Sequence, residues 1–381
     1  MPLGAGRNRR ARVNGGKTAG RPVSEKGGRS MSKVRIGVIG CGVIGTLHLR
    51  AAAQSPLIDV VAVADLIEER RLRAAAEFGV PQVYSDGDTL LEESDAAGVV
   101  LAVPAGDRIE MPLHALERGK HVLIEKPVAM SGAMLQRYID AQGDLVAGCC
   151  SSRFQAFPST SAAADVVASG ALGALRSIHC RAIVPAGPPP ASPPPPWRLN
   201  RERNAGGILT NWGCYDLDYL MTITGWSLVP RTVLAMTWGV PEPFVPNVAP
   251  GSDAESHFSA FIACEGGTVI TFERGEYVAS AGESVWRIVG ELGTLRLTMT
   301  RHAGEQLWLD QADAETGVVT RAFWEEADDW GRLHAGPIED FAAAILEGRA
   351  PRTDLHRSML VQRITDAIYA SAASGKVVEI A

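Results

Sequence analysis

The sequence predicts an α/β protein with a doubly wound parallel sheet in its N-terminal part and an antiparallel sheet farther along the chain. Apolar, β-branched runs alternate with segments of helical spacing over residues 34–124, which is the pattern of a parallel sheet with helices on both faces. Strand-like runs follow one another over residues 232–309, with turn residues such as Gly266 and Gly267 between them, which indicates antiparallel pairing. The length of 381 residues suits two domains.

The individual elements follow from these patterns in chain order. In the N-terminal part, strands are expected at residues 34–40, 60–64, 97–103 and 120–124, and helices at 46–54, 66–78 and 108–118. Farther on, strands are expected at residues 231–238, 257–263, 268–272 and 294–298, among others. A final helix is expected at about 355–373, and Gly375 provides its stop signal.

A glycine-rich turn joins the first predicted strand to the first predicted helix. Gly40 permits a tight turn, Gly42 lets the backbone approach a pyrophosphate, and Gly45 permits close packing of the helix on the strand. The phosphates are then expected at the N-terminus of the helix, where unpaired N–H groups attract anions. We therefore expect this turn, including Val43 and Ile44, to bind a dinucleotide.

Asp65 ends the second predicted strand, twenty residues after Gly45. An acidic side chain there can accept hydrogen bonds from the adenosine ribose hydroxyls, and it would repel the extra phosphate of NADP. The position favours NAD, although Arg70 and Arg71 could compensate and leave NADP possible. The alternative role for Asp65 is a helix N-cap.

Lys126 follows the predicted strand at the sheet edge where ligands are expected. The chain has six lysines among its 37 cationic side chains, and none between residues 127 and 375. Lysine can lose its proton or donate from a compact ammonium, whereas arginine stays charged. We therefore expect a chemical role for Lys126, with a surface salt bridge to Glu125 as the alternative.

Several motifs resemble those of the Gfo/Idh/MocA oxidoreductase family. They are the glycine-rich turn with His48 three residues after Gly45, residues 119–127 ending in Glu-Lys-Pro, Arg153-Phe154, Ala205-Gly206-Gly207, Gly213-Cys214-Tyr215, Asp218, and residues 368–371 and 375–380. The resemblance covers residues 33–381, and Glu-Lys-Pro is its most specific element.

The resemblance implies a nicotinamide-dependent dehydrogenase or reductase that acts on a sugar, polyol or sugar derivative. It implies a Rossmann domain, expected at residues 33–150, and a C-terminal α/β domain with a large open, mostly antiparallel sheet, expected at 151–353. Residues 354–381 are expected to pack back toward the first domain. In the family the lysine of Glu-Lys-Pro lies near the nicotinamide and the reacting hydroxyl, which assigns that role to Lys126. The family's sheet also forms a dimer or tetramer interface, so a homo-oligomer is expected.

Two further cofactor contacts are expected, from Pro104 and from Glu125. The family often carries a histidine a few residues after the proline. This chain has Arg108 there, so we expect no cofactor contact from that position.

The family's second catalytic position often reads Asp-x-x-x-His, and the matching residues are Asn211 and Tyr215. Their spacing puts both side chains on one helical face. We expect Tyr215 to transfer the proton, because a neighbouring ammonium such as Lys126 would lower the pKa of its phenol from about 10. A buried core aromatic is the alternative. Asn211 is expected to bind the substrate, since an amide is no base, and Asp218 either binds the substrate or pairs with a cation.

A segment rich in proline precedes the other candidate wall residues. Residues 185–196 contain eight prolines, which excludes a helix and predicts a rigid, extended loop over the active site. Trp197, Arg198, Arg153 and Trp212 are expected to offer a sugar stacking faces and fixed cations. Interface packing is the alternative for each of them.

The net charge and the short apolar runs argue against nucleic acid and membrane partners. The net charge is −6, and residues 1–30 hold eight cationic side chains against one acidic, so the rest of the chain is more acidic still. We expect residues 1–32 to form a disordered basic tail, and we expect no nucleic acid partner, because phosphate binding needs clustered basic side chains. No apolar run approaches the ~20 residues of a membrane-spanning helix, so no membrane partner is expected.

Cysteine and histidine spacing gives no sign of a metal. The six cysteines lack C-x-x-C spacing and the eight histidines lack H-x-x-x-H spacing, so we expect no metal site. Free cysteines in apolar segments indicate a reducing, cytoplasmic compartment.

Two other functions fit the same motifs. Some relatives cleave glycosides by transient NAD-dependent oxidation of the sugar, and they use the same fold. A non-catalytic sensor that binds a dinucleotide is the other alternative, since the usual acid and imidazole are replaced by Asn211 and Tyr215. The combination of Lys126 with Tyr215 favours the dehydrogenase.

Overall fold

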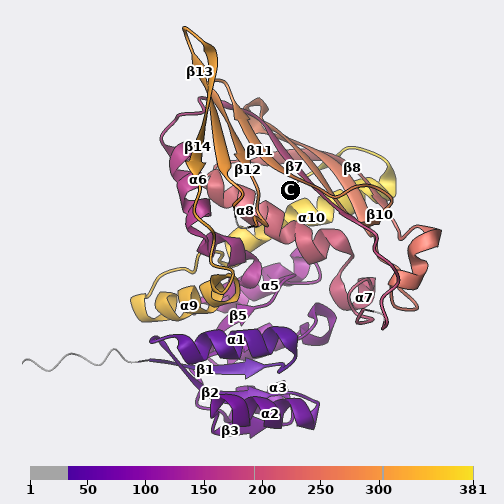
Figure 1. Ribbon diagram of the computed structural model, residues 1–381. Helices are drawn as coiled ribbons and strands as arrows, with labels where there is room; N and C mark the ends of the chain where they lie inside the picture. Colours follow the sequence, from indigo (N-terminus) through magenta and orange to yellow (C-terminus); the bar gives the residue numbers. More distant parts are fainter. Residues whose placement is uncertain (1–32, 193, 303, 381) are drawn as a thin grey trace, which may run out of the picture. The chain divides into compact units, whose positions relative to one another are not determined.

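Six short strands form a parallel sheet in the N-terminal part of the computed structural model, which describes residues 33–192, 194–302 and 304–380 (Figure 1). They are β1 Val34–Ile39, β2 Ile58–Ala64, β3 Gln82–Tyr84, β4 Gly98–Leu101, β5 His121–Ile124 and β6 Ala147–Cys149. Their order is β3-β2-β1-β4-β5-β6, with parallel neighbours throughout. This order confirms the predicted doubly wound sheet, whose ligand crevice lies where the chain reverses direction between β1 and β4.

Helices cover both faces of this sheet, because alternate residues of each strand point into two separate cores. The helices are α1 Val43–Gln54, α2 Glu68–Phe78, α3 Gly87–Glu93, α4 Met111–Glu117 and α5 Gly132–Gln142. One core contains Leu101 with Leu90 and Leu135, and the other contains Val100 with Leu49. Burial on both faces explains why these strands are apolar throughout. Four elements, β3, α3, α5 and β6, have no counterpart among the predicted elements.

A second sheet follows in the order β14-β13-β12-β11-β7-β10-β9-β8-β15, and only the pair β7 and β10 is parallel. Its strands are β7 Leu175–Pro185, β8 Pro230–Trp238, β9 His257–Cys264, β10 Val269–Val278, β11 Glu283–Gly290, β12 Gly293–Leu297, β13 Leu307–Asp313, β14 Gly317–Trp324 and β15 Val378–Glu379. The predicted mostly antiparallel sheet is thereby confirmed.

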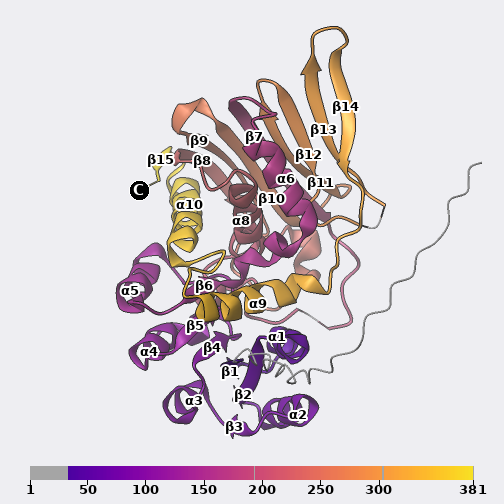
Figure 2. The same cartoon turned by 90° about the vertical axis from the view of Figure 1, so that its left-hand side faces the viewer.

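Helices cover one face of the second sheet. Figure 2 shows α6 Pro158–Ala168, α8 Cys214–Ile223 and α10 Leu355–Ser374 lying along this face. Apolar side chains such as Leu217 and Ile364 pack there against inward-facing strand residues such as Phe272 and Trp286. No other described residue covers the opposite face where β8 and β9 lie side by side, and it exposes Leu234, Met236, Trp238 and Phe261 there.

The C-terminal helices connect the two sheets. α9 Arg332–Glu347 buries Ile338 and Phe341 in a core of the first sheet, although it lies within the range predicted for the second domain. α10 contributes Leu355 to the first sheet's other core and Ile364 to the core of the second. It ends at Gly375, which adopts the left-handed conformation at φ +66° that favours glycine, as the stop signal predicts.

The proline-rich loop leads toward the first sheet. Beyond β7, Asn247 Nδ2 donates to the carbonyl oxygen of Gly187 at 2.9 Å. The short helix α7 Arg201–Asn204 then reaches the turn 105–108 after β4, where Arg203 pairs with Asp107. The predicted tail at residues 1–32 lies outside the described residues. Among those described, no helix is both long and apolar enough to cross a membrane.

Candidate active site

The glycine-rich turn forms an open cradle at the end of β1. Gly40 adopts φ +93°, and a Cβ on Gly45 would lie 1.7 Å from the carbonyl oxygen of Gly40. A Cβ on Gly42 would meet nothing closer than Arg70 at 4.0 Å. Val43 is 81% exposed, and no side chain caps the N-terminus of α1. The free N–H groups and the open approach fit a dinucleotide pyrophosphate.

Asp65 lies beside this cradle at the end of β2. Its Oδ2 accepts a hydrogen bond from the N–H of Cys41 at 2.7 Å, and its Oδ1 accepts from the N–H of Ile67 at 2.8 Å. The N-cap alternative is wrong, because α2 begins at Glu68 without a side-chain cap. The carboxylate joins the glycine-rich turn to the end of β2 and is partly exposed.

Lys126 reaches from the end of β5 toward the second sheet's helices. Its Nζ donates to Asn211 Oδ1 at 2.6 Å and to the Asn211 carbonyl oxygen at 3.0 Å. Asn211 sits in a π-helical stretch, Leu209–Gly213, which leads into α8. Burial lowers the pKa of the Lys126 ammonium, and Arg153 adds to this effect. The side chain of Lys126 thus contacts Asn211, and it forms no salt bridge with Glu125 among the described residues.

Arg108 holds the loop that carries Lys126. It is buried and donates to the carbonyl oxygens of Val103, Glu125 and Pro127. All three acceptors are backbone atoms: two belong to the Glu-Lys-Pro segment, and Val103 lies just after β4. Arg108 therefore braces the loop. Pro104, at the start of the turn 105–108, is half-buried at the same edge.

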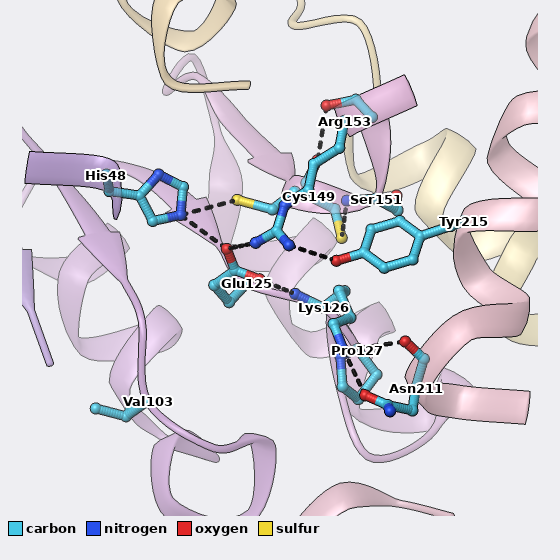
Figure 3. A network of polar contacts seen from close by, with 12 residues as sticks. His48, Val103, Glu125, Lys126, Pro127, Cys149, Ser151, Arg153, Asn211 and Tyr215 are labelled. Atoms are coloured by element: carbon cyan, nitrogen blue, oxygen red, sulfur yellow. Dashed lines mark hydrogen bonds and ion pairs between the residues drawn. The ribbon is translucent and has the colours of Figure 1, made fainter. Parts of the chain in front are cut away.

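A chain of buried polar contacts runs beside Lys126 (Figure 3). His48 Nε2 lies 2.7 Å from Glu125 Oε1, Arg153 Nη2 pairs with the same oxygen, and Arg153 Nη1 donates to Tyr215 Oη at 2.7 Å. Burial alone would raise the pKa of Glu125. The Arg153 guanidinium and His48 outweigh burial and hold that pKa well below its ordinary range. Glu125 is thus an anion that anchors Arg153, rather than a side chain aimed at a cofactor.

The two halves of this site match profiles of one protein family. The profile of the GFO/IDH/MocA oxidoreductase family with an NAD-binding Rossmann fold matches residues 34–144, and that of the GFO/IDH/MocA C-terminal domain matches residues 160–296. The chain belongs to the Gfo/Idh/MocA oxidoreductase family. It is therefore an NAD(P)-dependent oxidoreductase, and the predictions of family, enzyme class and cofactor are confirmed.

The chain is similar to several known dehydrogenases, over most of its length or over about half of it. D-xylose 1-dehydrogenase (NADP(+)) 2 of Haloferax volcanii is 26% identical over 90% of this chain and 99% of its own length. Inositol 2-dehydrogenase 2 of Saccharopolyspora erythraea is 31% identical over 52% of this chain and 56% of its own. A levoglucosan dehydrogenase structure in complex with NADH and L-sorbose superposes with a TM-score of 0.79 at 22% identity, over 92% of this chain and 100% of the other. These relatives are sugar or polyol dehydrogenases, whereas the superposition itself supports the fold.

The structure corrects the predicted environment of Tyr215 within the Gfo/Idh/MocA site. Lys126 Nζ lies 5.5 Å from the ring centroid, and the cation on the phenol oxygen is Arg153. Burial holds the pKa of Tyr215 well above its ordinary value of 10, with Arg153 opposing and Glu125 adding to the rise. The prediction that Lys126 lowers this pKa is wrong, because burial dominates and Arg153 takes the position predicted for Lys126. Tyr215 is 4% exposed, packed edge-on against Phe154.

Arg153 and Asp218, both predicted to bind the substrate, make internal contacts in this structure. Both are buried, and the guanidinium of Arg153 is taken by Glu125 and Tyr215. Asp218 accepts hydrogen bonds from Ser151, Gln155 and Thr353 at 2.6–2.9 Å. The carboxylate is thus satisfied by neutral donors and pairs with no cation among the described residues. The alternative of an ion pair is wrong for the described residues, because this face of the helix points into the core, whereas substrate binding by Asp218 stays a prediction.

The other predicted wall residues differ in what they contact. Arg198 pairs with Glu276 and donates to Tyr277 Oη at 3.0 Å, which fixes the guanidinium. Trp212 is half-buried, stacks under Arg274 at 4.9 Å, and lies 5.6 Å from the Tyr215 ring. Trp197 is half-buried beside Arg198 in the chain.

Two ion pairs near the site could not be predicted from the sequence. Asp216 accepts from Arg274 at 2.6 and 2.8 Å and from Trp286 at 3.0 Å, which fixes the guanidinium under Trp212. Glu276, the partner of Arg198, likewise lies at the end of β10. No local signal marks these residues, because each pair joins segments about sixty to eighty positions apart.

His48, Glu125 and Cys150 place three possible metal ligands within 4.8 Å of one another. The chemistry of the group does not fit a cation. Arg153 already pairs with the Glu125 oxygen that would bind the metal. Burial raises the pKa of the Cys150 thiol well above its ordinary value, so the thiolate that metals require is disfavoured.

Proposed function

We propose that the protein transfers a hydride between the nicotinamide of NAD(P) and a hydroxyl-bearing carbon of a sugar, polyol or sugar derivative. The observation that carries the proposal is the position of Lys126. It stands at the carboxyl end of β5, on the sheet edge that holds the glycine-rich cradle, and it contacts Asn211 across the gap to α8. A reacting hydroxyl between cofactor and helix would therefore meet a lysine.

The residues expected to hold the cofactor are those of the sheet edge. The cradle of Gly40, Gly42 and Gly45, with Val43 and Ile44, offers N–H groups to the pyrophosphate, and Asp65 offers a carboxylate to the adenosine ribose. When bound, the nicotinamide accepts or supplies the hydride, which is chemistry that amino acid side chains lack. Arg70 lies beside the cradle, where its positive charge could compensate for Asp65 and allow NADP to bind.

Lys126 and Tyr215 handle the proton. The ammonium group of Lys126 has three N–H groups, and two of them donate to Asn211. Among the described residues the third has no acceptor, so it can donate to a substrate oxygen. Its lowered pKa makes the neutral amine more accessible than in an exposed lysine. Tyr215 is the second proton-transfer group, below Lys126.

The site suits a substrate with several hydroxyls. Asn211 spends its carbonyl oxygen on Lys126, so its amide N–H groups remain for a neighbouring hydroxyl. Trp212 adds an aromatic face of the kind that packs on sugar rings. The names of the xylose, inositol and levoglucosan dehydrogenases among the relatives support the same class.

A panel of sugars and polyols tests this function. Purified protein is incubated with each compound, and absorbance of NADH and NADPH is followed separately in both directions. Steady reduction of NAD by at least one compound is expected. Release of free sugar without net NADH would instead indicate glycoside cleavage, and NADH binding without turnover on any compound would indicate a sensor.

We also propose a homo-oligomer formed through the outer face of the second sheet. Leu234, Met236, Trp238 and Phe261 form one exposed apolar patch there, which a partner would cover. Light scattering is expected to give a dimer or tetramer, and Phe261→Asp is expected to reduce the mass. A monomeric wild-type protein would contradict this arrangement.

A further inference from the structure

Arg153 joins the cofactor side of the site to α8. It is 5% exposed and lies on the short helical stretch after β6. One guanidinium nitrogen donates to Tyr215 Oη at 2.7 Å, and the other pairs with Glu125. Neither nitrogen is aimed at a free surface. The arginine therefore acts on its two protein partners.

The direction of the hydrogen bond fixes the role of Tyr215. A guanidinium has only donors, so the phenol oxygen must accept from Arg153. The phenol's own hydrogen then has to donate elsewhere, and no acceptor for it occurs in residues 33–192, 194–302 or 304–380. A buried donor without an acceptor costs about 1–3 kcal/mol. An oxygen of the substrate would remove that cost.

Glu125 holds Arg153 in place from the other end. Its Oε1 also accepts from His48 Nε2 at 2.7 Å when that nitrogen carries the hydrogen. His48 is fully buried on α1, the helix that begins in the glycine-rich cradle. Figure 3 shows this series of contacts from His48 through Glu125 and Arg153 to Tyr215. The position of the phenol is thereby tied to the cofactor-binding helix.

We propose that Arg153 is a positioning residue for Tyr215: it directs the phenol O–H to the reacting oxygen of the substrate and stabilises the phenolate left when the proton has moved. The inference rests on the proposed function. In carbonyl reduction the O–H bond of Tyr215 breaks, the proton joins the substrate oxygen, and the electron pair stays on Oη. Alcohol oxidation reverses each of these changes while the established cofactor chemistry takes the hydride.

The charges around Tyr215 agree with this role. Burial disfavours the phenolate of Tyr215, and so does the Glu125 carboxylate. Cys150 and Cys214 also face the phenol, but burial raises the pKa of both thiols and keeps them neutral. Lys126 faces the ring rather than the oxygen. Arg153 is thus the cation placed to stabilise the charge, and charge-assisted hydrogen bonds are about twice as strong as neutral ones.

A double-mutant cycle tests the inference on the active enzyme. Arg153→Met is expected to lower kcat about a hundredfold while KM changes less than about threefold, since the interaction is made in the transition state. Arg153→Lys should recover part of the loss. In the Tyr215→Phe background, Arg153→Met is expected to cost less than about threefold. Losses that multiply in the double variant would overturn the inference.

A spectroscopic measurement tests the contact without any turnover. The NMR signal of the Tyr215 ζ-carbon, assigned in tyrosine-labelled protein by its absence in Tyr215→Phe, should shift in Arg153→Met or Arg153→Lys. An unchanged signal would overturn the inference. A failure to oxidise any sugar or polyol would instead contradict only the proposed function, because the NMR measurement needs no turnover. Arg301→Met is the matched control: Arg301 is equally buried but pairs with Asp328, and it should leave the signal in place.

Discussion

The glycine-rich cradle and the buried contacts around Arg153 are two sides of one site, built in opposite ways. The cradle is backbone: three glycines within six residues create the turn, and its ligand groups are N–H bonds at the start of α1. The Arg153 side is made of side chains from α1, the end of β5, the stretch after β6 and α8. The cradle is open to a ligand, whereas the charged side chains around Arg153 are buried and contact one another.

This difference separates binding from chemistry. A backbone cradle can accept a cofactor without rearrangement, because no side chain among the described residues caps the N–H groups at the start of α1. The charged side chains of the second side already have protein partners, since Glu125 pairs with Arg153 and Lys126 donates to Asn211. Changes on the two sides should therefore affect different constants.

The largest expected effect is the loss of Lys126. Lys126→Ala should lower kcat about a thousandfold, which is the range for removal of a proton-transfer group. NADH should still bind, because the cradle lies on β1 and α1. Steady-state kinetics and titration of NADH fluorescence measure the two quantities. A variant that keeps full turnover would end the assignment of Lys126.

Lys120 offers a matched control for that experiment. It is the other lysine next to β5, it is buried, and its Nζ donates to the carbonyl oxygens of Ser94 and Ala96, both at 2.9 Å. Lys120→Met should lower the free energy of unfolding while kcat stays near the wild-type value. Equal losses of kcat in both variants would show that disrupted folding, not chemistry, explains the Lys126 result.

A pair of glycine substitutions separates the fold of the cradle from its binding. Gly45→Ala places a Cβ 1.7 Å from a backbone oxygen, so it should lower the free energy of unfolding by about 2–4 kcal/mol. Gly42→Ala meets only open space and should change stability by less than about 0.5 kcal/mol. It should nevertheless weaken NADH binding about tenfold, or about 1.4 kcal/mol. Urea unfolding and fluorescence titration of both variants check this, and unaltered NADH affinity in Gly42→Ala would contradict the cradle.

The same contrast explains which parts of the molecule could be predicted from sequence. Alternating strands and helices, the glycine turn and the stop at Gly375 are encoded within short windows, so their positions are correct to within a few residues. β3 and α3 were too short to give a periodic signal. The covered and open faces of the second sheet follow from strand alternation, which gives no strand order.

The side-chain network could not be predicted in this way. Tyr215 and Asp218 share a helix, yet one meets Arg153 and the other meets Thr353, 135 positions away. Which cation reaches the phenol depends on where the chain after β6 turns, and that is a long-range property. The residue types of the site could therefore be predicted, whereas their pairings could not.

Asp65 tests cofactor choice on the backbone side. Asp65→Ser removes the carboxylate that would repel the NADP phosphate, and Arg70 lies near the cradle. The ratio of kcat/KM for NAD to that for NADP should fall about tenfold, which is about 1.4 kcal/mol. Part of the change would come from a looser turn, because Asp65 also binds the N–H of Cys41. Asp65→Asn keeps an acceptor for that N–H and is the control; an unchanged ratio in both variants would exclude Asp65 from cofactor choice.

The smallest expected effect lies on the charged side, at His334 of α9. Burial lowers the pKa of this half-buried histidine from 6.5 to about 4, and Arg153 and His48 add to the effect. Below pH 6.5 this histidine binds a proton in the unfolded chain, whereas in the folded chain it binds one only at about pH 4. Stability present above pH 6.5 is therefore lost as the pH falls through this window.

Urea unfolding at pH about 7 and about 5 measures this contribution of His334, which should be about 1 kcal/mol once partial exposure is allowed for. His334→Gln should lose that much less stability than the wild type between the two conditions. His302→Gln removes an exposed histidine far from Arg153 in the sequence and should follow the wild type. The cradle contains no histidine, so Gly42→Ala should also keep the wild-type pH dependence. If it did not, the acid sensitivity would belong to the whole fold and not to the charged side of the site.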